Sequence, residues 1–385
     1  MEYMSRYVRK FMAVRQNALL TVLALWFLLS SFTSYAKIIT AGPWLQAATE
    51  TSVVIMWETA LPQPGKVVYG LTSSYGETTV SQPTIIAAAN TDSTTDTSAI
   101  IHEVKLTGLQ PNTTYHYKVG TDGYYSDDNT FRTHGKKDKY RMLHISDSHL
   151  FERNAEKAMH SMISYKPDFV ILSGDITHKS INNEFRTHFV RGYHLFKNTV
   201  HYTCKGNHDD RPWSKYSAWF HNDFPGAFSE DFYAFDIGPI HFVGMNNNMR
   251  HKDFPPGSLD WLENNLAKSQ ARWKIVFMKA HPDPDGKYIP QRVAFMIPIF
   301  TKYGVDVVMT GGNADGFAKQ INGVWYQHAG VGHNNGYFIV EISDAELKSM
   351  YRNQRGAVRE TFTIHKELTS IQMNSEIAGQ GSHIR

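Results

Sequence analysis

The first third of the chain has the hydrophobic pattern of short β-strands. Between residues 115 and 119 the apolar side chains of Tyr115, Tyr117 and Val119 alternate with polar ones, which is typical of a half-buried strand. Turn-forming clusters such as Pro62–Gly65 separate the runs. We therefore predict a small β-sandwich over residues 38–133. Its strands are expected at 51–58, 66–69, 102–106 and 114–119, and the Ala-, Thr-, Ser- and Asp-rich stretch 84–98 is expected to be a loop.

After the charged segment 134–139 the pattern changes to apolar runs that alternate with helix-like stretches. The runs are nearly continuous, as expected for strands of a sheet that is covered on both faces. Strands that alternate with helices predict an α/β layer architecture over residues 140–365, followed by a polar tail at 366–385. The runs lie at 141–146, 169–173, 199–204, 240–244, 274–278 and 305–309, and the helical stretches at 154–165, 183–196 and 259–269.

Residues 1–36 have the pattern of a cleaved secretory signal peptide. Four basic residues precede a run with few polar residues from Ala18 to Phe32, and Ser34-Tyr35-Ala36 supplies small residues at the cleavage positions. The alternative is a membrane anchor, but the apolar run is short for a bilayer span. No later stretch is long and apolar enough to cross a membrane. The mature protein is therefore predicted to be secreted or periplasmic, without a stable membrane span.

The charge of the mature chain argues against a polyanionic partner. The full sequence has 39 basic and 36 acidic residues, and removal of the signal peptide takes away four basic residues and Glu2, which leaves 35 of each. No nucleic-acid partner is expected, and the substrate is predicted to be small. The single cysteine, Cys204, excludes an intrachain disulfide and is interpreted as a buried filler.

Residues of the types that bind metals recur directly after the predicted strands. They are Asp147 and His149, then Asp175, then Asn207 and His208, and finally His281. In open α/β sheets, sites form beyond the carboxyl ends of the strands, so these residues are expected to converge. Carboxylate, imidazole and amide donors suit divalent ions, and a shared carboxylate such as Asp175 can bridge two ions about 3.5–4 Å apart.

Each of these residues also has a plainer interpretation. Asp147 and His149 could be a turn and a surface histidine, and Asp175 could cap a helix. Asn207 could serve a tight turn, and His281 alone is weak evidence for a ligand. Their joint appearance, in this order, favours the site.

The ordered set Asp-x-His, Gly-Asp, Gly-Asn-His-Asp and a single histidine after a strand resembles the calcineurin-like metallophosphoesterase superfamily. The segments Gly42–Gln46 and 51–58 resemble the start of the purple acid phosphatase N-terminal domain, and 106–115 resembles the corner of a fibronectin type III domain. The resemblance implies a fibronectin-like β-sandwich followed by an α/β domain of two packed sheets flanked by helices.

The resemblance also implies roles for the candidate residues. Asp147 and His149 would bind a first metal, Asp175 would bridge, and Asn207 and His281 would bind a second metal. His208 would act on the leaving group as a general acid. Two divalent ions (Mn, Zn or Fe) and a small phosphorylated substrate are expected. Asp209 is expected to stabilise the loop.

The sequence departs from this family at two places. The tyrosine of the purple enzymes, three residues after the bridging Asp, is replaced by His178, so we expect a colourless protein. The final Gly-His-x-His motif is degraded, because its histidine positions are occupied by Gly312 and Ala314. Candidate substitute ligands are Asn313 and Asp315. His328 and His333 are further candidates, although core or surface positions are expected for both, and the site is expected to hold either one metal firmly or two weakly.

We therefore predict a secreted or periplasmic phosphoesterase that hydrolyses phosphate mono- or diesters with metal-activated hydroxide. One alternative is a catalytically impaired pseudoenzyme that binds phosphate or one metal, and another is an envelope binding module. The sequence makes no prediction of the oligomeric state.

Overall fold

The computed structural model describes residues 38–90, 96–121, 123–149, 155–247, 254–282, 295–312, 316–330, 336–353 and 356–367. The described residues from Ile39 onward belong to one compact unit. The predicted signal peptide and nearly all of the predicted polar tail lie outside the described residues. Among the helices that are described, none is long and apolar enough to cross a membrane.

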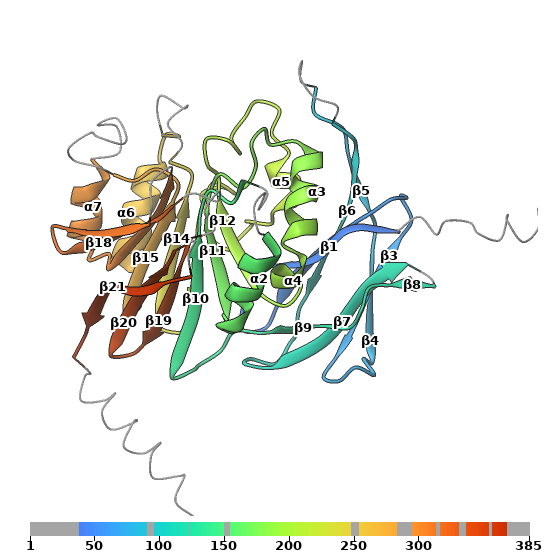
Figure 1. Cartoon of the computed structure of the whole chain (residues 1–385), viewed down its shortest axis with the longest axis horizontal. Coiled ribbons are helices and arrows are strands. Elements are labelled where there is room, and N and C mark those ends of the chain that lie inside the picture. Colours follow the sequence, from blue (N-terminus) through green and yellow to red (C-terminus); the bar gives the residue numbers. More distant parts are fainter. Residues whose placement is uncertain are drawn as a thin grey trace, which may run out of the picture. The chain divides into compact units, whose positions relative to one another are not determined.

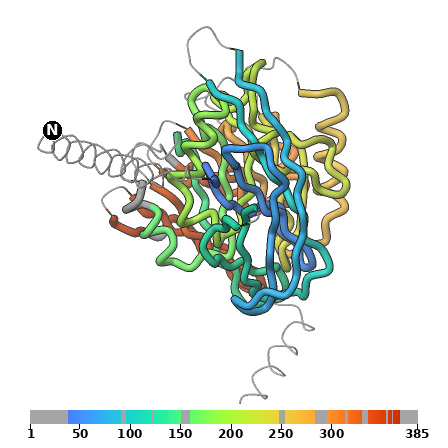
Figure 2. The backbone as a smooth tube through the Cα atoms, turned by 90° about the vertical axis from the view of Figure 1, so that its right-hand side faces the viewer, coloured from blue at the N-terminus to red at the C-terminus, as the bar shows by residue number. Residues whose placement is uncertain are grey.

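The N-terminal part is a β-sandwich, as predicted. One of its sheets contains β3 (Gly65–Gly70), β4 (Glu77–Ser81), β7 (Thr114–Thr121), β8 (Tyr124–Tyr125) and β9 (Asn129–Arg132). Facing it are β1 (Ile39–Gln46), β2 (Val53–Thr59), β5 (Thr84–Ile86) and β6 (Ala99–Leu106). Figure 2 shows these blue and cyan strands together on the side towards the viewer. Trp57, Val67 and Tyr117 are fully buried in the hydrophobic core. The predicted loop at 84–98 contains the short strand β5.

The sandwich shares a sheet with the α/β part. β1 pairs in parallel with β12 (Val200–Cys204), Gln46 opposite His201. This pair joins β1, β2, β6 and β5 to six strands of the α/β part in a single ten-stranded sheet. The ring of Trp44 stacks on Phe189 at 4.0 Å and on Trp219 at 5.6 Å, which covers the junction with aromatic side chains. The sheet therefore crosses the predicted domain boundary at 134–139.

Three neighbouring parallel strands carry the first candidate residues. β10 (Lys139–Ile145) pairs with β11 (Phe169–Ser173), and β11 pairs with β12, both in parallel. Four helices connect or follow these strands, and α3 and α4 pack against β1. Their bounds are α2 Ala155–Ser164, α3 Asn182–Arg191, α4 Tyr193–Phe196 and α5 Tyr216–Trp219. The single helix predicted at 183–196 is thus two helices that meet at Gly192.

A second, six-stranded sheet packs on the first. Its order is β13-β14-β15-β16-β18-β17, and its core faces β10, β11 and β12. On its other side, α6 (Ser258–Lys268) and α7 (Met296–Lys302) pack on it through a separate apolar cluster. Figure 1 shows these two helices beside the strands on the left of the view. The predicted architecture of two packed sheets flanked by helices is confirmed. The strands are β13 Phe232–Ile237, β14 Ile240–Met245, β15 Trp273–Met278, β16 Val307–Gly312, β17 Phe317–Ile321 and β18 Val324–Gly330.

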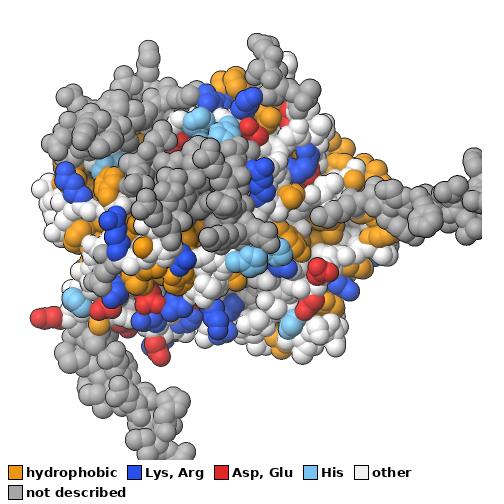
Figure 3. Space-filling view, viewed as in Figure 1, with side chains coloured by type: hydrophobic (Ala, Val, Ile, Leu, Met, Phe, Trp, Pro, Cys, Tyr) orange, Lys and Arg blue, Asp and Glu red, His pale blue; other side chains and the backbone are white. Residues whose placement is uncertain are grey.

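The chain ends on the first sheet. β19 (Tyr337–Ser343) pairs antiparallel with β10, followed in order by β20 (Glu346–Arg352) and β21 (Val358–His365). On the face shown in Figure 3, acidic and basic side chains are interspersed rather than gathered by sign. That mixture is consistent with the balanced charge of the mature sequence.

A buried polar relay connects the two sheets. Ser349 Oγ donates to Gln327 Oε1 at 2.7 Å, and Gln327 Nε2 donates to His144 Nδ1 at 2.9 Å. Because His144 accepts at Nδ1, its Nε2 carries the proton and donates to Ser173 Oγ at 2.8 Å. Burial lowers the pKa of His144 to about 3, so the ring stays neutral and the relay is fully satisfied.

Candidate functional site

The loops that follow β10 and β11 hold their polar residues in a left-handed backbone conformation. Asp147, His149 and Asp175 have φ angles of 50°, 37° and 51°. Outside glycine this region is uncommon, and residues held there cluster at functional sites. The backbone links the two loops, since Asp147 N donates to Gly174 O at 3.0 Å and His149 N donates to Asp175 O at 3.2 Å.

Glycines let the loops approach one another. A Cβ on Gly206 would overlap the carboxylate of Asp175, and a Cβ on Gly174 would lie 2.8 Å from the backbone of Gly206. A Cβ on Gly311, at the end of β16, would overlap Ser146 Oγ and lie 2.7 Å from Asp147 Oδ2. Only glycine fits at these three positions, which bring the ends of both sheets together.

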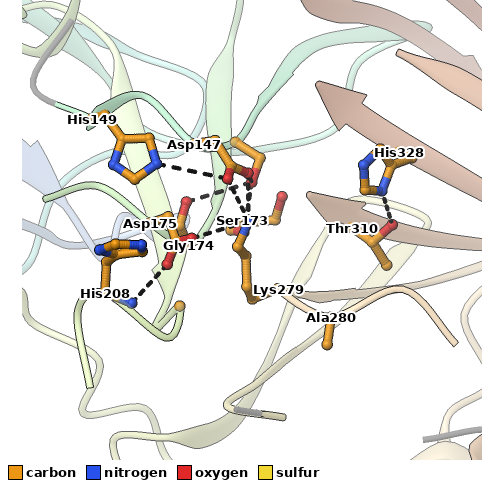
Figure 4. Close-up of polar contacts among 12 residues, drawn as sticks. Asp147, His149, Ser173, Gly174, Asp175, His208, Lys279, Ala280, Thr310 and His328 are labelled. Carbon is orange, nitrogen blue, oxygen red and sulfur yellow. Dashed lines mark hydrogen bonds and ion pairs between the residues drawn. The ribbon is translucent and has the colours of Figure 1, made fainter. Parts of the chain in front are cut away.

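Asp147, His149 and Asp175 form one buried cluster. Each offers a ligand atom, and these atoms all lie within 4.8 Å of one another. His149 Nε2 is 3.8 Å from Asp147 Oδ1, and Figure 4 shows both side chains turned towards Asp175. Burial is the largest cause that lowers the pKa of His149, to about 4, so its ring is neutral and available as a donor of an electron pair.

A lysine fills the space between the two carboxylates. Lys279 directly follows β15 and is 6% exposed. Its Nζ lies 2.6 Å from Asp147 Oδ1, 2.5 Å from Asp147 Oδ2 and 3.2 Å from Asp175 Oδ2 (Figure 4). Burial alone would lower the pKa of Lys279, but attraction to the two carboxylates outweighs it and raises the pKa. Lys279 is therefore a buried ammonium.

His208 lies at the edge of this cluster. Its backbone N–H donates to Asp175 Oδ1 at 2.9 Å, and its Nδ1 donates to the carbonyl oxygen of His178 at 2.9 Å. The ring meets His149 edge-on at 5.1 Å, and His178 stacks on His149 at 4.5 Å. Three imidazoles therefore border the carboxylates. The hydrogen bond from Nδ1 holds the His208 ring in place, and Nε2 is the other nitrogen of that ring.

Asp209 holds the loops in place, as predicted. Its buried carboxylate accepts hydrogen bonds from the backbone N–H groups of Ile176, Thr177 and Gly206. Burial is the main cause that raises the pKa of Asp209 to about 7, and the backbone donors oppose that rise. Asp209 therefore ties together the backbones of the two loops that carry Asp175 and His208.

His281 does not join the cluster. Its Nδ1 lies 3.3 Å from Thr310 Oγ1, and its ring contacts Phe317, Tyr326 and His328 edge-on at 5.4–5.8 Å between centroids. The side chain thus packs among residues of the second sheet. His328, one of the alternative ligands, is likewise committed to Thr310 Oγ1 at 3.2 Å and stacks on Phe317.

The remaining predicted ligands have mixed outcomes. Asn207 lies half-buried in the loop between Gly206 and His208, next to the cluster. Gly312 ends β16, and a Cβ there would lie 3.0 Å from His328 Cε1, so this position faces the second-sheet histidine. Asn313, Ala314, Asp315 and His333 lie outside the described residues.

The described donors fit one divalent ion by their chemistry, but they do not fit a pair. Two carboxylates and an imidazole are ordinary ligands of such an ion. Of the second set predicted from the sequence, His281 lies outside this cluster of described His, Asp and Glu side chains and contacts Thr310. Moreover, the carboxylates of the first set already bind Lys279.

Two residues of the site escaped the sequence interpretation. Lys279 stands at the carboxyl end of a buried apolar strand, the same position that singled out the other residues, and that signal could have identified it. Gly311 follows the run predicted as a strand at 305–309, and its close approach to Ser146 depends on how the two sheets pack, which no local pattern encodes.

Comparison with known proteins agrees with this geometry. Residues 43–133 match the purple acid phosphatase N-terminal domain, and residues 140–314 match the calcineurin-like phosphoesterase family. "Probable glycerophosphodiester phosphodiesterase GpdQ" of Arcobacter nitrofigilis is 28% identical over 169 residues, which are 37% of this chain and 56% of that protein. Purple acid phosphatase 15 of Arabidopsis thaliana is 25% identical over 268 residues, 56% of this chain and 48% of that protein.

The chain thus spans about half the length of the curated relatives it matches. Among solved structures, that of PhoD aligns with a TM-score of 0.61, covers 91% of this chain and 99% of that chain, and is 11% identical. At this identity the likeness concerns the fold alone. The family resemblance noted in the sequence is confirmed for both parts of the chain.

Proposed function

Because the chain joins a purple acid phosphatase N-terminal domain to a calcineurin-like phosphoesterase domain, we propose that it hydrolyses phosphate mono- or diesters outside the cytoplasm. The observation that carries this proposal is the convergence of Asp147, His149, Asp175 and His208 at the carboxyl ends of parallel strands. Such a cluster places charge and proton-transfer groups around a single point, as phosphoryl transfer requires.

Phosphoryl transfer needs a positive charge beside the phosphoryl oxygens. With Lys279 withdrawn from the carboxylates, Asp147, His149 and Asp175 would hold one divalent ion (Mn, Zn or Fe), which when bound would supply a Lewis acid and an acidified water. The other cation on the spot is the ammonium of Lys279. Whichever cation serves, the carboxylates position it next to His208.

His208 has the geometry of a general acid. Its Nδ1–H is used by the carbonyl of His178, so a neutral ring has no proton on Nε2. The protonated ring carries a second proton on Nε2 and can give it to the departing alkoxide. Asp175 Oδ1 fixes the backbone of His208 at 2.9 Å and thereby orients the ring.

The proposed substrate class rests on the relatives, and the proposed location rests on the N-terminal sequence. The names of the relatives include a phosphodiesterase and acid phosphatases, which is why both mono- and diesters are proposed. The basic and apolar pattern of residues 1–36 supports export with cleavage after Ala36. N-terminal sequencing of the exported protein should then begin at Lys37.

A second candidate function is binding of phosphate esters without turnover. The ion pair of Lys279 with Asp147 and the glycine at position 312 favour it, because an ammonium cannot generate a metal-bound hydroxide. The envelope binding module expected as a further alternative has no comparable support among the described contacts.

Hydrolysis of p-nitrophenyl phosphate and bis(p-nitrophenyl) phosphate tests the proposal, with Mn, Zn or Fe and with chelator. We expect measurable turnover that His208→Asn lowers by about 10²–10⁴-fold. His194→Asn, an exposed histidine of α4, is the matched control and should leave the rate unchanged. Absence of turnover under every condition, with phosphate still bound, would select the second candidate.

A further inference from the structure

Lys279 lies where the cluster requires a cation. We propose that its ammonium permanently takes the place of a metal ion between Asp147 and Asp175, so that the cluster carries its own countercharge. This inference shares its site with the proposed function, but it concerns the cation and holds or fails independently of turnover.

The contacts of the ammonium match its bonding capacity. Nζ lies within 3.2 Å of three carboxylate oxygens, two on Asp147 and one on Asp175, and an ammonium has three N–H donors. The side chain is 6% exposed, so solvent competes little for these donors. Charge-assisted hydrogen bonds of this kind are the strong ones in proteins.

The backbone fixes the lysine in this place. The carbonyl of Lys279 accepts from Gly311 N at 3.0 Å, which ties the end of β15 to the end of β16. The side chain of Asn247 holds the next residue at both of its backbone polar groups. Ala280 N donates to Asn247 Oδ1 at 2.9 Å, and Asn247 Nδ2 donates to Ala280 O at 2.8 Å. The lysine stem also passes close over Gly174.

A metal and this ammonium exclude one another. An ion bound by Asp147 and Asp175 would lie about 2.0–2.2 Å from the carboxylate oxygens that Nζ also contacts. Two cations that share those oxygens would repel strongly in a buried site of low dielectric. Binding of a metal therefore requires Lys279 to leave, and its clamped backbone limits where the side chain can go.

Two other described positions are consistent with a lost metal requirement. Gly312 supplies no ligand where the family motif has a histidine, and His281 is directed to Thr310. Two buried carboxylates nevertheless need a positive partner, because an unpaired buried charge is strongly destabilising. The ammonium of Lys279 supplies that positive charge, so the two carboxylates need no metal ion and no further metal ligands.

Metal content and metal-dependent stability of the full chain test the inference. Protein purified without chelator is exposed to Mn²⁺ or Zn²⁺, and bound ions per chain are counted by elemental mass spectrometry. Wild type should retain well under one ion per chain, and its Tm should not respond to the ions. Lys279→Met should lower Tm without metal, and Mn²⁺ or Zn²⁺ should restore much of the loss as one ion binds.

Two further variants show that the change arises in the cluster. Lys279→Met with Asp147→Asn should lose the gained ion, because one carboxylate is removed. Lys274→Met removes a lysine from the opposite end of the same strand, where Nζ donates to Leu266 O and Tyr303 O, and it should gain no ion. A gain of metal by both lysine variants would contradict the inference.

Wild type decides the matter even if Lys279→Met does not fold. One or two ions retained per wild-type chain, with a Tm that falls on chelation, would overturn the inference while leaving the proposed hydrolysis intact. An ion-free wild type that still hydrolyses the nitrophenyl esters in chelator would support the inference and the proposed function together. An ion-free and inactive wild type would support the inference and reject hydrolysis.

Discussion

The ammonium of Lys279 is bound to both oxygens of Asp147, at 2.6 and 2.5 Å. This contact joins the end of a strand in one sheet to the end of a strand in the other, through two side chains that are 6% and 1% exposed. The positive charge at the site therefore comes from a side chain of the protein itself. Substitutions that remove Lys279 are the ones expected to let the carboxylates bind a metal ion.

Restoring the family histidines should not by itself restore metal binding. The double variant Gly312→His with Ala314→His adds imidazoles, but Lys279 still binds Asp147. We expect the double variant to remain poor in metal and the triple variant with Lys279→Met to bind it, with affinity at least about 10–100-fold higher. Isothermal titration with Zn²⁺ measures both. Equal affinity of the two variants would show that Lys279 is no barrier.

Gly311 should be far less tolerant of substitution than its neighbour Gly312. A Cβ at 311 overlaps Ser146 Oγ, whereas a Cβ at 312 meets only the tip of the His328 ring at 3.0 Å. Gly311→Ala should lower the free energy of unfolding by about 1–3 kcal/mol, and Gly312→Ala by clearly less. Urea unfolding of both variants measures this difference, and equal losses would mean that the two sheets are not packed as described.

Stability should fall as the pH is lowered below about 6.5. Burial lowers the pKa of His144 and of His201 to about 3, whereas in the unfolded chain these rings titrate near 6.5. Between those two values the unfolded state binds more protons than the folded state, so acidification favours unfolding. Each histidine contributes a slope of about 1.4 kcal/mol per pH unit in that window.

A variant isolates the contribution of one ring. His144→Gln breaks the relay and should be less stable at pH 7.5, but its stability should decline less steeply between pH 6.5 and 4 than that of wild type. Thermal unfolding across that range gives both slopes. Parallel curves would show that His144 is not the group that titrates.

The junction between sandwich and α/β part should be essential to the fold. Trp44 is fully buried between Phe189 and Trp219, and β1 covers the edge of β12. Trp44→Ala should cost about 3–5 kcal/mol, whereas Trp213→Ala, at a side chain that is 39% exposed, should cost far less. A chain that begins at residue 134 should fail to fold cooperatively, and a sharp thermal transition of that fragment would contradict this expectation.

The sequence predicted well what depends on local pattern and on parallel strands. The run 169–173 is β11 as predicted, and the parallel pairing of β10, β11 and β12 brings Asp147, His149 and Asp175 together. The convergence could be foreseen because the carboxyl ends of parallel strands share one edge of a sheet. The left-handed backbone at all three residues is the local feature that completes the cluster.

What escaped prediction depends on contacts between distant segments. The chain leaves the extended conformation after Met278, so strand alternation no longer determines where Lys279 and His281 point. Lys279 turned into the cluster and His281 turned towards Thr310. The pairing of Gln46 with His201 across the predicted domain boundary depends on packing of residues far apart in sequence, which no local pattern encodes.

The relay from Ser349 to Ser173 has a further consequence for the fidelity of folding. A strand that slips by two residues keeps every apolar side chain on its original face, so the hydrophobic pattern cannot reject that error. Such a slip of β18 would carry Gln327 away from both His144 and Ser349 and leave buried polar groups without partners. The relay therefore favours the strand register in which the loops around Asp175 come together over registers shifted by two residues.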